Sequence, residues 1–161
     1  MAKENKTNVM RILEAEKVAY RPYYYENHDG KIDGVSVAAK LGQDVDRVYK
    51  TLVTRGASGG FFVFVVPVAE ELNLKAAAKS VGEKSVEMIH VTEINKVTGY
   101  IRGGCSPVGM KKQYVTVLDA SCEALETMIV SGGKIGTQVE LSPKDLMRVA
   151  GAKTAPVAIR P

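Results

Sequence analysis

Residues 50 to 66 have the sequence KTLVTRGASGGFFVFVV, and this stretch predicts the central element of the fold. Lys50 to Thr54 alternates around Leu52, as a strand does when one of its faces is buried. Phe61 to Val66 contains only β-branched and aromatic residues, which is typical of a strand buried on both faces. Because the glycine-rich segment Arg55 to Gly60 lies between the two, we expect a β-hairpin.

Helices and shorter strands are interleaved on both sides of this hairpin. The expected helices follow a polar residue that can cap the first turn, and most of them end at a glycine. They start after Thr7 (with Val9, Ile12 and Leu13 on one face), after Ser36 (37–41, ending at Gly42), after Asn73 (74–81, ending at Gly82) and after Ser142 (with Pro143, ending at Gly151). Shorter helical pieces are expected after Asp44, at Thr92–Thr98 and at Ser121–Leu125, and further strands at Val18–Tyr25, Val86–Ile89, Tyr114–Leu118, Thr127–Val130 and Thr137–Leu141.

The order of these elements indicates the fold class. Because the helices do not alternate regularly with the strands, a doubly wound parallel sheet is disfavoured. We expect a mixed α/β (α+β) fold with a curled, mostly antiparallel or mixed sheet around a pocket and flanking helices. The chain has 161 residues and contains no linker or internal repeat, so we expect a single domain spanning residues 1–161.

Composition excludes several protein classes. With 45% hydrophobic and 25% charged residues, the chain matches globular proteins and not disordered, collagen-like or coiled-coil ones. Its cysteines, Cys105 and Cys122, form no CxxC pair, and with only His28 and His90 besides them there is no zinc signature. We therefore expect a reducing compartment, no metal and no other cofactor. The charged start MAKENKTNVMRILEAEKV lacks the apolar region of a signal peptide, which favours a cytoplasmic protein.

The net charge of +4 permits a polyanionic partner without requiring one. The distribution of the charges is more informative than their sum. The stretch from Lys96 to Val117 contains no acid and four cations, namely Lys96, Arg102, Lys111 and Lys112. It is either a solvated loop or a rim that faces phosphate groups.

Common catalytic motifs are missing. Gly132-Gly133-Lys134 looks like the end of a P-loop, but the first glycine of that motif is absent and Ile135 stands where a hydroxyl residue must hold magnesium. No GxSxG or HExxH pattern occurs, and the two histidines have no obvious serine or carboxylate partner. Enzymes based on these motifs are therefore disfavoured.

Three other groups of residues remain as candidates for a site. Lys50 lies on the same strand face as Leu52, so it is either a snorkelling edge residue or a cation that points into a cavity. The loop from Gly99 to Gly109 is rich in glycine, and such loops expose backbone N–H groups that bind anions. Ser131-Gly132-Gly133-Lys134 is either an ordinary hairpin turn or the lining of a pocket.

Four motifs resemble those of the YbaK/EbsC family in order and spacing. They are VYKTL (48–52), GY (99–100), GGCSPVGMKK (103–112) and SGGK (131–134), and the resemblance extends from the first helix to Leu146. Members of this family are free-standing Cys-tRNA(Pro) deacylases related to the editing domain of bacterial prolyl-tRNA synthetases. The resemblance implies a barrel-like sheet and hydrolysis of an aminoacyl ester on the terminal adenosine of tRNA(Pro), without a metal, with prolyl-tRNA synthetase as a partner.

The resemblance also implies roles for individual residues. Lys50 would hold the phosphate or ribose end of the tRNA, and Tyr25 would be the pocket tyrosine, although Tyr23 and Tyr24 beside it leave this assignment open. Close members carry an acidic residue near the position of Gln138. This chain has an amide there, so the role that the acidic residue has in those members does not carry over with certainty. Cys105 is expected to pack and not to attack. The implied catalytic residues are Lys50, Tyr25, Gly103 and Gly104, and the implied substrate-binding residues are Tyr100, Ser106, Pro107, Lys111, Lys112, Gly132 and Gly133.

The missing general base is compatible with this chemistry. An aminoacyl ester is already activated, so a protein can act by orienting it and stabilising the oxyanion with backbone donors. By resemblance, the cysteinyl thiol of the substrate would attack its own carbonyl. Two alternatives remain: a deacylase for Ala-tRNA(Pro) or a broader set of tRNAs that uses activated water, and a non-catalytic module that binds RNA or a synthetase.

Overall fold

The computed structural model describes residues 6–160. Residues 1–5 and Pro161 lie outside the described residues. Residues 1–5 are part of the charged start from which the absence of a signal peptide is expected. The helices are α1 (Asn8–Ala15), α2 (Gly34–Leu41), α3 (Leu74–Ser80), α4 (Ile94–Thr98) and α5 (Pro143–Ala150), with 3₁₀ turns at Val45–Arg47, Val91–Glu93 and Ala120–Ala124. The strands are β1 (Arg21–Tyr24), β2 (Tyr49–Gly56), β3 (Phe61–Pro67), β4 (Glu71–Leu72), β5 (Val86–Met88), β6 (Val115–Asp119), β7 (Met128–Lys134), β8 (Thr137–Leu141), β9 (Ala152–Ala155) and β10 (Ala158–Ile159).

The predicted hairpin is the centre of a five-stranded sheet. Its order is β5-β2-β3-β6-β9, and β2 and β3 pair antiparallel from Tyr49–Pro67 to Arg55–Phe61. The β3–β6 and β6–β9 pairs are parallel, so the sheet is mixed. Phe64 in β3 has no exposed surface, as the apolar run of this strand predicts.

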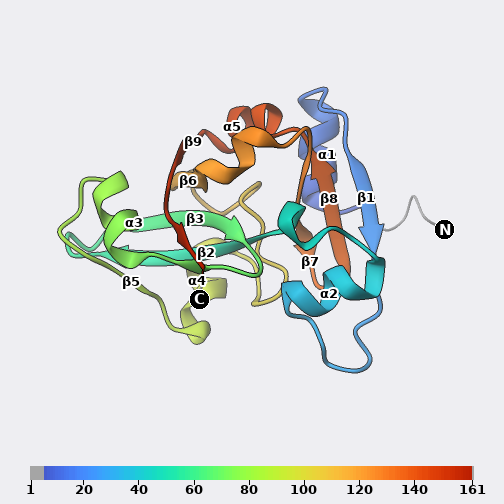
Figure 1. The fold of residues 1–161 in the computed structure, drawn as a ribbon, viewed down its shortest axis with the longest axis horizontal. Coiled ribbons are helices and arrows are strands. Elements are labelled where there is room, and N and C mark those ends of the chain that lie inside the picture. Colours follow the sequence, from blue (N-terminus) through green and yellow to red (C-terminus); the bar gives the residue numbers. More distant parts are fainter. Residues whose placement is uncertain (1–5, 161) are drawn as a thin grey trace.

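A second, antiparallel sheet has the order β1-β8-β7. An isolated parallel bridge between Val48 and Ile129 connects it to the start of β2. Figure 1 shows the two sheets side by side, with α1 and α5 at one end of β8 and α2 at the other. Leu13 of α1 and Leu146 of α5 meet Met128 and Val139 of this sheet in the largest buried cluster.

The mixed α/β fold class with mostly antiparallel pairing is confirmed. The strands of the two larger sheets curl around a cavity, but these sheets are joined at one bridge and do not close into a continuous barrel, and β4 and β10 form a separate two-stranded sheet. In the part of the chain from residue 6 to residue 160, no helix is both long and apolar enough to cross a membrane.

Two local predictions were wrong. The second helix begins at Gly34 and not after Ser36, because the side chain of Asp33 accepts a hydrogen bond from the backbone N–H of Ser36 and so provides an earlier cap. The segment Ser131–Lys134 is not a hairpin turn. It belongs to β7 and continues to pair with β8 through a bulge, and the turn follows at Ile135–Gly136.

Other boundaries differ by a few residues, and three short strands were not predicted. The expected turn at Arg55–Gly60 begins later, because Arg55 and Gly56 still belong to β2 and pair with β5. The strands β4, β9 and β10 are short or half-exposed, so their sequences show no clear alternation. β9 and β10 are held in part by Asp119, whose carboxylate accepts hydrogen bonds from the N–H groups of Val157 and Ala158, both at 2.9 Å.

Candidate functional site

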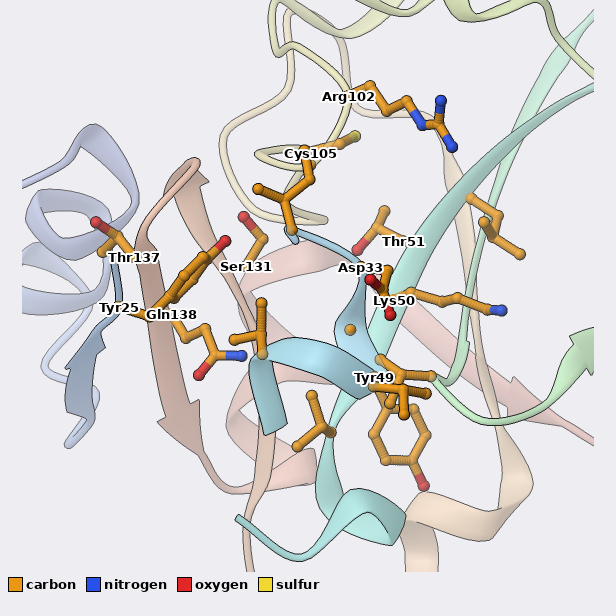
Figure 2. A pocket seen from close by; sticks show the side chains of 18 of the residues that line it. Tyr25, Asp33, Tyr49, Lys50, Thr51, Arg102, Cys105, Ser131, Thr137 and Gln138 are labelled. Carbon is orange, nitrogen blue, oxygen red and sulfur yellow. The ribbon is translucent and has the colours of Figure 1, made fainter. Parts of the chain in front are cut away.

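A cavity of about 720 Å³ opens where the two sheets diverge. This volume lies within the range of about 300–1,000 Å³ that is usual for sites of small organic groups. Its walls come from the start of β2, the segment that leads into α2, the loop after α4, and strands β7 and β8 (Figure 2). The polar side chains on it include Tyr25, Asp33, Lys50, Thr51, Arg102, Cys105, Ser131, Thr137 and Gln138.

Strand pairing explains why the cavity opens at this place. β2 pairs with β3 from Tyr49 to Arg55, but on its other edge β5 pairs only with Thr54–Gly56. The bridge from Val48 to Ile129 lies at the opposite end of the same edge. No described strand pairs with the edge of β2 between these two points, so Lys50, Thr51 and Leu52 border the cavity.

Lys50 contributes a cation to this cavity. Its side chain is half-buried, and among residues 6–160 no carboxylate lies within ion-pair distance of its ammonium group. Burial lowers the pKa of Lys50, while the charge of Glu71 acts in the opposite direction. A cation that is partly removed from water without a partner favours an anionic or electron-rich ligand.

Of the three neighbouring tyrosines, only Tyr25 lines the cavity. Its backbone N–H donates to the carbonyl of Gly136 at 3.0 Å, which fixes it beside the β7–β8 turn. Tyr24 is exposed, and the hydroxyl of Tyr23 donates to Glu140 at 2.5 Å. The structure thus brings together Tyr25 and Lys50, which are far apart in the sequence.

The glycine-rich loop contributes Gly103 to the cavity, whereas Gly104 is buried behind it. The backbone N–H of Gly104 already donates to the carbonyl of Ile101 at 3.0 Å. A Cβ atom at position 104 would lie 2.9 Å from the Cα of Lys134. Gly104 is therefore required for the close approach of this loop to the end of β7, and its N–H group is occupied within the turn.

The remaining predicted residues of this loop do not line the cavity. Ser106 is fully buried, and its Oγ accepts a hydrogen bond from the N–H of Val108 at 3.3 Å. The hydroxyl of Tyr100 donates to the carbonyl of Val108, and burial raises the pKa of Tyr100 to about 12. Pro107 lies on a separate small crevice. These residues shape the loop that carries Gly103.

Gly132 and Gly133 are also outside the cavity lining, which β7 supplies through Ser131. A Cβ atom at position 132 would lie 2.8 Å from the methyl group of Thr137, and one at position 133 would lie 2.9 Å from Val9. Gly133 also has a positive φ of 101° at the bulge of β7. The two glycines thus allow the bulged strand to pack closely.

Lys111 and Lys112 are exposed and lie away from the cavity lining. The ammonium group of Lys111 donates to the carbonyl of Lys96 at 3.2 Å. The cation of this stretch that does reach the cavity is Arg102, which was part of the acid-free segment but was not among the predicted site residues. In Figure 2 its guanidinium group and the ammonium group of Lys50 extend toward the same side.

Two further polar residues of the cavity were missed or left in doubt. Thr51 follows Lys50 on β2, and its hydroxyl is buried without a hydrogen-bond partner among the described residues. Gln138 is buried on β8, where its Oε1 accepts from Nε2 of Gln43 at 2.8 Å. Position 138, where close members of the family carry an acidic residue, is therefore occupied by a neutral amide that a hydrogen bond holds in one orientation.

Cys105 borders the cavity but has the properties of a packing residue. It lies against Val53, Ile89 and Val97, and burial raises the pKa of its thiol to about 11, although a hydrogen bond to Thr98 lowers it. Cysteine nucleophiles act as thiolates, which a pKa of this size makes rare at neutral pH.

We expect Cys105→Ala to retain the activity of the protein within about threefold and to lose roughly 1 kcal/mol of stability from packing. The ester-hydrolysis assay given below, together with thermal unfolding, measures both quantities. A loss of activity of about a hundredfold at an unchanged melting temperature would contradict this assignment.

The chemistry that the cavity supports follows from its groups. Within residues 6–160, no cluster of three or more His, Cys, Asp or Glu side chains is arranged to hold a metal ion. Asp33 is the acid on the lining, and its hydrogen bonds to Ser36 lower its pKa. Two cations and several hydroxyls can bind a phosphorylated ligand and polarise a carbonyl group.

Comparisons with known proteins agree with this picture. The family model of the aminoacyl-tRNA editing domain matches residues 32–149. A protein of Enterococcus faecalis named "Putative Cys-tRNA(Pro)/Cys-tRNA(Cys) deacylase EbsC" is 42% identical over 157 residues, which cover 98% of this chain and 96% of that protein. The crystal structure of the hypothetical protein APE2540 has a TM-score of 0.86 at 25% identity, over 95% of this chain and all of that one. A "putative trans-editing enzyme for prolyl tRNA synthetase" shares the fold, with a TM-score of 0.78 at 22% identity over 95% of this chain and 98% of that one.

Proposed function

The chain belongs to the aminoacyl-tRNA editing domain family, and from this membership we propose that it is a trans-acting deacylase that removes cysteine from mischarged Cys-tRNA(Pro). The resemblance drawn from the sequence motifs is thereby confirmed. The observation that carries the proposal is the half-buried ammonium group of Lys50 at the cavity between the two larger sheets, for which residues 6–160 provide no ion-pair partner. It supports binding of the phosphate or ribose at the 3′ end of a tRNA, with the aminoacyl ester inside the cavity.

The reaction that we propose uses the thiol of the substrate. The cysteinyl Sγ attacks its own carbonyl carbon, a C–S bond forms, and the bond from that carbon to the ribose oxygen breaks. The thiol proton passes to the ribose oxygen, so the products are tRNA with a free hydroxyl and a cyclic thioester that water opens to cysteine. This scheme requires no protein nucleophile, which is compatible with the raised thiol pKa of Cys105.

Several residues in and around the cavity have a role in this scheme. Lys50 and Arg102 would bind the phosphate and ribose end, and Tyr25 and Gly103 would contact the aminoacyl group across the cavity. The other residues of the glycine-rich loop would act indirectly by fixing the loop that carries Gly103; they are Tyr100, Gly104, Ser106 and Pro107. The bulge next to Ser131 would depend on Gly132 and Gly133. Lys111 and Lys112, on the exposed surface, would contact acceptor-stem phosphates.

Selectivity follows from the chemistry of the substrate. Cysteine and alanine differ by one sulfur atom, and contacts of this size provide only about 1–3 kcal/mol of discrimination. A reacting thiol discriminates more strongly, because an ester without it has no nucleophile. We propose that a partner, prolyl-tRNA synthetase, selects tRNA(Pro). We also propose that the whole chain forms a single editing domain.

The test of the proposed function is the release of labelled amino acid from Cys-, Ala- and Ser-tRNA(Pro). We expect the protein to hydrolyse the Cys ester and to leave the other two at their spontaneous rates, because only cysteine supplies a thiol. Hydrolysis of Ala-tRNA(Pro) would point to activated water, which is the mechanism of the broader deacylase. No release from any ester would leave a binding module as the function.

A further inference from the structure

We propose that the hydroxyl of Thr51 is a catalytic hydrogen-bond donor that stabilises the oxyanion formed from the ester carbonyl. This inference rests on the proposed function, because it assigns a role in the same reaction. It differs from the expectation from the sequence, which placed the oxyanion donors on the backbone of the glycine-rich loop.

The first argument is the state of the Thr51 hydroxyl. Its Oγ1 is buried, and no atom of residues 6–160 accepts or donates a hydrogen bond to it. Buried polar groups nearly always have a partner, and a group without one in the free protein has already lost its contacts with water. Thr51 lines the cavity, so a ligand that enters the cavity lies next to the residue whose hydroxyl lacks a partner.

The second argument is the direction of the side chains. In Figure 2 the Thr51 hydroxyl points toward the side of the cavity from which Tyr25 and Ser131 present theirs, whereas Lys50 extends the opposite way. Neighbouring residues of a strand point to opposite faces, so the Lys50 ammonium group and the Thr51 hydroxyl lie on opposite sides of β2. A substrate held at its phosphate end by Lys50 would present its ester bond near Thr51.

The third argument is the rigidity of Thr51 compared with the other donors. Gly104 N–H is occupied by the carbonyl of Ile101. Tyr25 lies just beyond the end of β1, and Ser131 lies beside the bulge of β7. Thr51 belongs to β2 and pairs with Val65 of β3, the central strand of the five-stranded sheet, and its β-branched side chain has few rotamers. Oxyanion stabilisation requires a donor that is already in place before the reaction, and a hydroxyl on a paired strand meets this requirement.

The experiment compares wild type, Thr51→Val and Thr51→Ser on Cys-tRNA(Pro), with kcat and KM determined separately. Valine keeps the shape of threonine and removes the hydroxyl, so we expect kcat to fall about 30-fold with little change in KM, as the loss of one hydrogen bond to a charged group predicts. We expect Thr51→Ser, which keeps the hydroxyl, to remain within about fivefold of wild type.

Thr137→Val is the matched control. Thr137 also carries a buried hydroxyl without a partner among the described residues, but this hydroxyl points away from Tyr25 and Thr51 in Figure 2. In both valine variants we expect the melting temperature to stay the same or rise, because an unsatisfied buried hydroxyl is replaced by a methyl group. Only Thr51→Val should lose kcat.

Three results would overturn the inference. They are an unchanged kcat in Thr51→Val, an equal loss in Thr51→Ser, or an equal loss in Thr137→Val. A wild-type protein that releases no amino acid from any ester is a different outcome: the proposed function then fails, and the role of Thr51 fails with it.

Discussion

Lys50→Ala is expected to lower kcat/KM for Cys-tRNA(Pro) by roughly 1,000-fold, which is the largest loss that we expect from any single substitution. The physical reason is that Lys50 provides the cation on the β2 side of the cavity, and that this cation is half-buried without an ion-pair partner in residues 6–160. Without it, the phosphate or ribose end of the substrate loses its anchor, and the ester is no longer held in a reactive geometry. The measurement is the release of labelled cysteine under single-turnover conditions.

Two variants separate the charge of Lys50 from its shape. Lys50→Met keeps most of the aliphatic chain and should lose as much activity as Lys50→Ala, whereas Lys50→Arg should retain part of it. Since removal of a partly desolvated cation relieves a cost to folding, the melting temperature should not fall in Lys50→Met. Full activity in Lys50→Met would show that the charge is not required and would remove the main support for the proposed function.

Glu140→Ala is expected to cost about 3 kcal/mol of stability, because several partners depend on one partly buried carboxylate. Glu140 accepts hydrogen bonds from Tyr23 at 2.5 Å, from Arg47 at 3.1 Å and from Thr127. Tyr23 lies two residues before Tyr25 and Arg47 three residues before Lys50. Loss of this carboxylate should therefore also lower kcat/KM, on the order of tenfold.

The contribution of Glu140 depends on pH. Burial raises the pKa of this carboxyl, but the hydrogen bonds from Thr127 and Tyr23 and the charge of Arg47 outweigh it, so that the pKa lies below the ordinary 4.5. Because the pKa is depressed in the folded state, the stabilisation is complete above the unfolded pKa and is lost as the pH falls through the folded one. The difference in unfolding free energy between wild type and Glu140→Gln should shrink when the pH is lowered from 7 to 3.

Glu16→Ala is the control for this prediction. Glu16 also pairs with an arginine, Arg148, but both side chains are more than half exposed, so its loss should cost less than 1 kcal/mol. Chemical denaturation of the three variants at two pH values gives the comparison. Equal stabilities of Glu140→Ala and Glu16→Ala would show that the Glu140 network does not stabilise the fold.

Local patterns predicted the parts of the molecule that depend on residues close together in the sequence. The β2–β3 hairpin was expected because alternation and a glycine-rich turn act within a few residues, and the antiparallel pairing of β2 with β3 confirms it. The helix caps at Thr7, Asn73 and Ser142 were expected for the same reason, since a cap binds an N–H group three residues later. The prediction of Ser36 as a cap was wrong because Asp33 competes for the same role.

The candidate site could be predicted only in part. Lys50 was identified because a cation on an apolar strand is unusual, and the motif around it carried the family resemblance. Sequence alone left open which of three tyrosines belongs to the site, and the pairing of β1 with β8 decides it by placing Tyr25 next to Gly136. Arg102 was considered only as one of four cations on a possible phosphate-facing rim, and Thr51 was not predicted, because neither residue type is unusual where it stands.

The sequence by itself determined the hairpin, the helix caps at Thr7, Asn73 and Ser142, and the motifs by which the chain resembles the editing-domain family, and it marked Lys50 as a candidate site residue. Only the tertiary structure decided that Gly103 faces the cavity while Gly104 packs against Lys134, and that the hydroxyl of Thr51 has no partner among the described residues. The physical reason is that the cavity forms where β2 loses its second neighbour, between β5 and the bridge from Val48 to Ile129. That gap is a property of strands distant in sequence, and no local pattern encodes it.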